Sequence, residues 1–168
     1  TLESLGRSEA AIEEYIQSLA IHRQLAELDP ANADWRREVA LCHMRLGVIL
    51  RDTDAAKAMP HLTQAVEILD ALFQSDTTNS ERRLDFACAR MELAHGLLAA
   101  GETAGAVAEA QGALNALGPV PGDAGDRPRQ VLEGEVRLML GDALSATGHR
   151  TEARAAWAEA ESVLKPLA

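Results

Sequence analysis

The sequence predicts an all-α fold, a solenoid of about seven helices packed in pairs. Two features of the composition favour helices: only 3% of the 168 residues are aromatic, whereas alanine and leucine are abundant. Sheets draw instead on aromatic and β-branched residues. The third observation is a pattern of small residues that returns at a fixed interval. Because a chain of this length can bury a core of its own, we expect a single domain over residues 1–168.

The small-residue pattern has a period of 47 or 48 residues, since its copies begin at the alanines in positions 11, 58, 106 and 153. A glycine stands five residues ahead of three copies, at Gly6, Gly101 and Gly148, and Asp54 lies near the corresponding place in the fourth. Small residues three, four or seven positions apart form a flat stripe that a second helix can approach closely. The pattern therefore predicts pairs of helices joined at these turns.

The expected helices follow one another along the chain, separated by breakers and caps. Asp29-Pro30 ends the first helix, and Asn32, Asp54 and Asp126 are expected N-caps. Residues 118–125, which include two prolines, are expected to form a connecting loop. The helices cover residues 8–28, 32–51, 54–74, 80–100, 102–117, 126–147 and 150–164.

Two further expectations concern the boundaries of the units. Pro60 should kink the third helix or delay its start, because proline lacks the backbone donor. Residues 1–5 can supply only the tail of an earlier helix that ends at Gly6, so we expect the chain to begin inside a repeat and to be a fragment of a longer protein. The expected units are 1–32 (partial), 33–79, 80–126 and 127–168, the last including a polar C-terminal cap.

The last pair of helices carries the most complete motif, with Leu-Gly in the first helix, a turn glycine, and small, aromatic and small residues in the second. These are Leu140, Gly141, Gly148, Ala153, Trp157 and Ala160. The set resembles the tetratricopeptide repeat, whose usual unit is about 34 residues. The longer unit here is similar to the variant in kinesin light chains and in multidomain bacterial signalling proteins, where a linker like Asp29-Pro30-Ala31-Asn32 is familiar. The resemblance implies a right-handed superhelical array of antiparallel helix pairs.

The resemblance also implies where a partner would bind, because the first helix of each tetratricopeptide pair lines the concave face. A leucine followed by a small residue recurs in the first helices, at Leu46, Leu93 and Leu140, and the positions two before and two after it should then point into the groove. Methionine suits such grooves because its thioether adapts to a peptide or helix. An alternative is that Met44 and Met91 are ordinary core residues. The expected groove residues are Leu41, Met44, Val48, Arg51, Cys88, Met91, His95, Leu98, Leu138 and Asp142.

Charge and cysteine content narrow the class of protein. The net charge of −10 argues against nucleic acid as a partner, because such binding neutralises phosphates with Lys and Arg. No apolar run is long enough to cross a membrane, and no leader pattern opens the sequence. Cys42 and Cys88 lie 46 residues apart without a CxxC motif, which fits a reducing cytoplasm.

Candidate chemistry is sparse. The motifs GxSxG, GxxxxGK and HExxH do not occur. The five histidines fall at unrelated positions of the repeat, so we expect no common histidine site. Cys88, Glu92 and His95 share a helix face, but without further ligands they predict no metal site. We therefore expect no enzyme activity and no cofactor.

The function expected from these features is a scaffold or protein-interaction module that binds a peptide or helix in its groove. Two alternatives stay open. The chain could instead be a non-catalytic regulatory segment of a larger enzyme, such as a bacterial signalling kinase or ATPase. It could also self-associate through exposed ends of the repeat and form a homo-oligomer.

Overall fold

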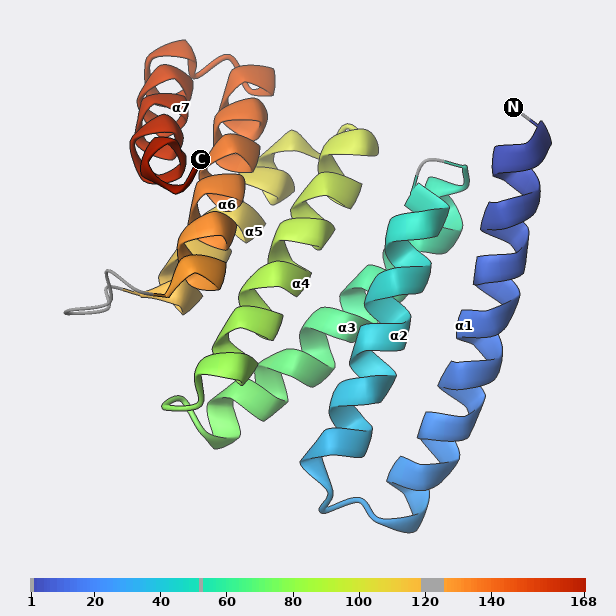
Figure 1. Ribbon diagram of the computed structural model, residues 1–168. Coiled ribbons are helices and arrows are strands. Elements are labelled where there is room, and N and C mark those ends of the chain that lie inside the picture. Colours follow the sequence, from blue (N-terminus) through green and yellow to red (C-terminus); the bar gives the residue numbers. More distant parts are fainter. Residues whose placement is uncertain (1, 52, 119–125) are drawn as a thin grey trace. The chain divides into compact units, whose positions relative to one another are not determined.

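The computed structural model describes residues 2–51, 53–118 and 126–168, and these residues form α-helices with no strand among them (Figure 1). The expected all-α fold class is therefore confirmed. Seven α-helices and a closing 3-10 turn, Lys165–Leu167, are described. The helices are α1 (Leu2–Leu28), α2 (Ala33–Arg51), α3 (Ala55–Ser75), α4 (Ser80–Ala99), α5 (Thr103–Leu117), α6 (Arg127–Ala146) and α7 (Arg150–Leu164).

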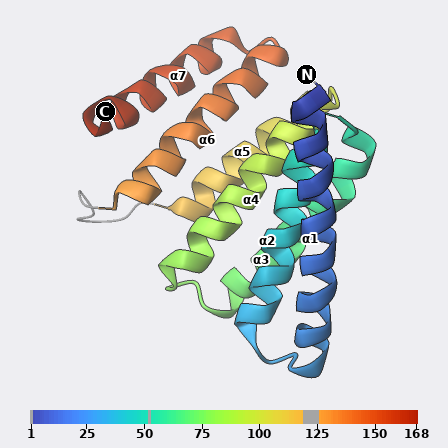
Figure 2. The same cartoon turned by 45° about the vertical axis from the view of Figure 1, so that its right-hand side comes forward.

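The helices belong to two compact units, Thr1–Asp76 and Thr77–Ala168, and each unit is described by itself. In the first unit α2 packs against both α1 and α3. In the second unit α4 packs on α5 and α6 packs on α7, while α6 also contacts α4 and α5. Neighbouring helices such as α6 and α7 run side by side in opposite directions (Figure 2).

The expected caps form, and they set the helix boundaries. The carboxylate of Asp54 accepts the backbone N–H of Lys57 at 3.1 Å, and that of Asp126 accepts the N–H of Arg129 at the same distance. The amide oxygen of Asn32 accepts the N–H of Asp34 at 3.0 Å. These bonds satisfy backbone amides that have no partner within the first helical turn. Because capping residues can be recognised in the sequence, most helix ends lie within one or two residues of their predicted positions.

One expectation about a boundary is wrong. Helix α1 runs unbroken through Gly6, so no turn forms there. Glycine tolerates helical dihedral angles as well as left-handed ones, and no proline or cap around Gly6 stops the helix. Pro60 lies inside α3, and of its two expected effects the delayed start does not occur, because α3 begins at Ala55. Only the carbonyl of Ala56 loses its helical partner, and Ala56 is exposed to water.

The other two turn glycines behave as expected. Gly101 has φ +81° and Gly148 has φ +85°, a conformation that costs residues with a Cβ atom. Each glycine follows the cap residue of a helix, and the next N–H reaches back over the turn. Glu102 donates to the carbonyl of Leu97 at 2.8 Å, and His149 donates to that of Leu144 at 2.9 Å. These are Schellman motifs, one after α4 and one after α6.

Complementary residue sizes bring the paired helices together. A Cβ on Gly47 of α2 would lie 2.5 Å from Cδ2 of Leu62 on α3, and a Cβ on Gly141 of α6 would overlap the indole of Trp157 on α7. The equivalent positions in α4 and α5 hold Ala94 and Ala110, both fully buried. Each pair thus matches a glycine with a large residue or an alanine with an alanine, as close packing requires.

Candidate functional site

The expected groove residues divide between the two units. Four lie on α2 in the first unit, four lie on α4 in the second, and two lie on α6. Met44 and Met91 are each only 6% exposed, which favours the alternative that they are core residues. The equivalent position on α6, Leu138, is 41% exposed, and Asp142 is also exposed. The two methionines therefore offer little surface to a partner.

The expectation that the histidines share no site is wrong for His43 and His61. Their Nδ1 atoms lie 2.9 Å apart, and Nη2 of Arg23 lies 2.9 Å from Nε2 of His43. A guanidinium can only donate, so Nε2 of His43 accepts and its Nδ1 carries the proton. That proton is donated to Nδ1 of His61. The chain of hydrogen bonds runs from Arg23 through His43 to His61, and it requires a neutral His43.

The surroundings of His43 favour this neutral form. Its side chain is 4% exposed, and burial, the neighbouring His61 and the charge on Arg23 together lower its pKa to about 4. Burial and Arg23 also lower the pKa of His61. Burial penalises the charged imidazolium, and the nearby guanidinium repels it. At neutral pH His43 is therefore a fixed acceptor that holds the Arg23 side chain in place.

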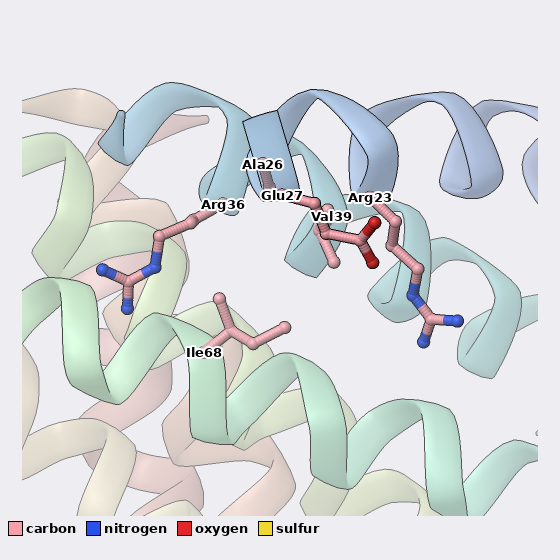
Figure 3. Close-up of a pocket in the computed structure, with 6 residues that line it drawn as sticks. All are labelled: Arg23, Ala26, Glu27, Arg36, Val39 and Ile68. Carbon is pink, nitrogen blue, oxygen red and sulfur yellow. The ribbon is translucent and has the colours of Figure 1, made fainter. Parts of the chain in front are cut away.

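A pocket of about 280 Å³ lies where α1, α2 and α3 meet, and Arg23 forms part of its wall (Figure 3). Ala26, Val39 and Ile68 give it an apolar floor. Figure 3 shows the guanidinium groups of Arg36 and Arg23 toward opposite ends of the pocket, with the carboxylate of Glu27 between them beside Val39. The lining residues are Arg23, Ala26, Glu27, Arg36, Val39 and Ile68.

The charges around this pocket are largely unpaired. Arg36 makes no hydrogen bond or ion pair with any residue that the structure describes, and the one hydrogen bond of Arg23 within these residues joins it to His43. Glu27 is likewise without a polar partner among the described residues. The lining carries a net charge of +1 on a chain of net charge −10. Apolar side chains beside the unpaired guanidinium of Arg36 suit a ligand with an aliphatic group next to a carboxylate.

A second polar cluster joins α1 to α2 nearby. The thiol of Cys42, 5% exposed, donates to Oγ of Ser18 at 3.4 Å and lies 3.7 Å from Nδ1 of His22. His22 also stacks on Trp35, with ring centroids 6.1 Å apart. Within the described ranges no three His, Cys, Asp or Glu residues are placed to hold a metal ion. We interpret this cluster as part of the helix interface.

The contact between His43 and His61 could have been predicted from the repeat period. His43 and His61 correspond in the next pair of helices to Arg90 and Glu109, which form an ion pair at 2.8 Å between α4 and α5. In the last pair Arg137 reaches from α6 to Glu159 on α7. Each first helix thus places a polar side chain at the same repeat position toward its second helix, although Glu159 lies three residues beyond the equivalent of Glu109. The contact between the two histidines can be predicted only when each is compared with the residue at the equivalent position of the next repeat.

No protein-family model matches the chain, and no curated protein matches its sequence. None of the helices in the described part of the chain combines the length and apolar character needed to cross a membrane. The case for a function therefore depends on the helix pairs and on the pocket at α1, α2 and α3.

Proposed function

We propose that this chain is a non-catalytic protein-interaction module of the tetratricopeptide kind that binds a short segment of a partner protein. The observation that carries the proposal is the pocket in which apolar side chains lie beside an unpaired Arg36. The segment that fits it has an acidic side chain next to an aliphatic one. The two free cysteines, Cys42 and Cys88, are compatible with a cytoplasmic setting.

The packing of the helices supports this proposal. Paired helices with glycine turns and matched small and large residues are the features that made the sequence resemble tetratricopeptide repeats, whose general role is to hold other proteins. If the partner binds this pocket, it contacts the end of α1 rather than the expected groove around Met44 and Met91. A module of this kind could also serve as the regulatory segment of a larger enzyme, and the contact would be the same.

Self-association is a second candidate, favoured by apolar residues on the surface of α1. Ile21 is 57% exposed and Leu28 is 83% exposed. They lie seven residues apart, so they share one face of the helix. Sedimentation velocity over a range of concentrations separates the candidates: a monomer throughout removes self-association, whereas a dimer abolished by Ile21→Lys with Leu28→Lys supports it.

The peptide proposal is tested by fluorescence anisotropy with short labelled peptides. One contains Leu-Glu, and two controls contain Leu-Gln or Ala-Glu in its place. We expect the Leu-Glu peptide to bind about tenfold more tightly than either control, because it satisfies both the floor and a guanidinium. Arg36→Gln should remove most of that preference. Arg45→Gln is the matched control, since Arg45 is an exposed arginine on the same helix without a polar partner among the described residues.

Two results would contradict the proposal. Equal binding of the Leu-Glu and Leu-Gln peptides would show that the arginines do not recognise the carboxylate. Equal loss of binding in Arg36→Gln and Arg45→Gln would show that only the general charge of α2 matters.

A further inference from the structure

A separate cavity lies in the second unit, where the end of α6 meets the start of α7. Its volume is about 280 Å³, and it is lined by Ser145, Arg150, Ala153, Arg154 and Trp157. The residues on α7 lie three, four and seven positions apart, so they share one face of the helix. The cavity therefore presents an indole, a hydroxyl and two guanidinium groups.

The indole of Trp157 is a fixed wall of this cavity. Its ring packs on Gly141 of α6 so closely that a Cβ there would overlap the indole nitrogen. The indole N–H donates to Oδ1 of Asp142 at 3.1 Å. Because packing and a hydrogen bond both hold the ring, it is ordered before any ligand binds. An apolar or flat group could contact it without rearranging the helix.

The two arginines are unpaired. Arg150 and Arg154 are both exposed, and neither makes a hydrogen bond or ion pair with the described part of the chain. Like charges four residues apart on a helix repel each other. The fold does not require these arginines, since the repeat-equivalent positions on α5 hold Thr103 and Val107. An unfavourable pair beside a cavity is the kind of local conflict that functional sites retain.

We propose that this cavity binds a phosphate monoester carried on an aromatic or apolar group. Such a phosphate carries a charge of about −1.5 to −2 at neutral pH, which matches two guanidiniums, whereas a carboxylate matches only one. Its three oxygens can accept from both arginines and from the hydroxyl of Ser145. Trp157 then contacts the group that carries the phosphate. This site does not depend on the pocket at α1, α2 and α3, so either proposal can fail alone.

The test follows the indole N–H signals in ¹H–¹⁵N spectra, because the chain has only two tryptophans, Trp35 and Trp157. Phenyl phosphate, inorganic phosphate and benzoate are titrated in the same buffer. We expect phenyl phosphate to shift the Trp157 signal to saturation and to bind about tenfold more tightly than either control. The Trp35 signal should stay in place. Phosphotyrosine and adenosine monophosphate then distinguish a peptide source of the phosphate from a nucleotide source.

Variants separate this site from charge in general. Arg150→Gln with Arg154→Gln should abolish the shift by phenyl phosphate while the thermal melt stays unchanged, because both side chains are exposed and unpaired. Arg45→Gln, in the other unit, should leave binding intact. Three results would overturn the proposal: no shift of Trp157, equal affinity for phenyl phosphate and inorganic phosphate, or full binding by the double variant.

Discussion

Arg23 donates a hydrogen bond from Nη2 to Nε2 of His43 at 2.9 Å, and this contact links the wall of a surface pocket to a buried histidine. The bond exists only while His43 is neutral, because a protonated imidazole has no acceptor to offer. His43 in turn donates to His61 on α3. Three helices of the first unit are thus joined by one chain of hydrogen bonds whose integrity depends on pH.

Stability should therefore fall as the pH is lowered from about 6.5 to about 4. The pKa of His43 is about 4 in the folded protein, against 6.5 for an ordinary histidine. Above pH 6.5 His43 is neutral in both states, whereas below it the unfolded chain takes up the proton first and is stabilised. The full loss is about 3 kcal/mol at most. Urea unfolding between pH 7.5 and 4.5 measures it.

The control for this prediction is a second histidine variant. His43→Gln should reduce the dependence of the unfolding free energy on pH, and the part that stays comes from His61, whose pKa is also lowered. His149→Gln, at an exposed position before α7, should leave the dependence as it is. A wild-type protein whose stability is constant over this range would show that His43 titrates normally.

Substitution by alanine should affect the two turn glycines, Gly101 and Gly148, differently from Gly6. Gly101→Ala and Gly148→Ala should each destabilise the fold by about 1 kcal/mol, because alanine is strained at positive φ. Gly6→Ala should instead be neutral or stabilising by up to about 1 kcal/mol, because Gly6 is inside α1. Thermal melts of the three variants test this contrast. Destabilisation by Gly6→Ala comparable to the other two would place Gly6 in a turn after all.

Most of the fold could be predicted from the sequence because its determinants are local. Asp54 and Asp126 cap the helices that follow them, and Gly101 and Gly148 close the turns, all from within a few residues. Gly6 shows the limit of that reasoning. The same residue type is compatible with a turn and with a helix, so its identity alone does not decide between them.

The candidate site was less predictable because it depends on contacts between helices. The pocket beside Arg36 is formed by side chains from three helices, and no motif marks any of them. Whether Met44 lines a groove or belongs to the core depends on what covers it, which the pattern along one helix does not contain. The pair of His43 and His61 could have been found, since the register that joins Arg90 to Glu109 predicts that these two positions meet.

Because the paired helices match a small residue with a large one, substitutions at Gly47 and Leu62 should have non-additive effects on the free energy of unfolding. Gly47→Ala alone forces the buried Leu62 side chain to move and should cost about 1–3 kcal/mol. Leu62→Ala alone leaves a cavity and should cost about 2–5 kcal/mol. The double variant recreates the alanine pair that α4 and α5 use, so its cost should be well below the sum. Urea unfolding of all four proteins completes the cycle, and additive costs would mean that the two residues do not compete for space.

The pair of Arg90 and Glu109 should be coupled to Gly112 in the same way. The guanidinium of Arg90 crosses the bare backbone of Gly112 to reach Glu109, and a Cβ on Gly112 would overlap it. In an Arg90→Gln background, Gly112→Ala should stabilise α5 by about 1 kcal/mol through helix propensity alone. In the wild type the same change also displaces Arg90 from Glu109, and a partly exposed ion pair of this kind contributes about 0.2–1 kcal/mol. The gain in the wild type should be smaller by that amount in a double-mutant cycle. An equal gain in both backgrounds would show that Arg90 reaches Glu109 by another path.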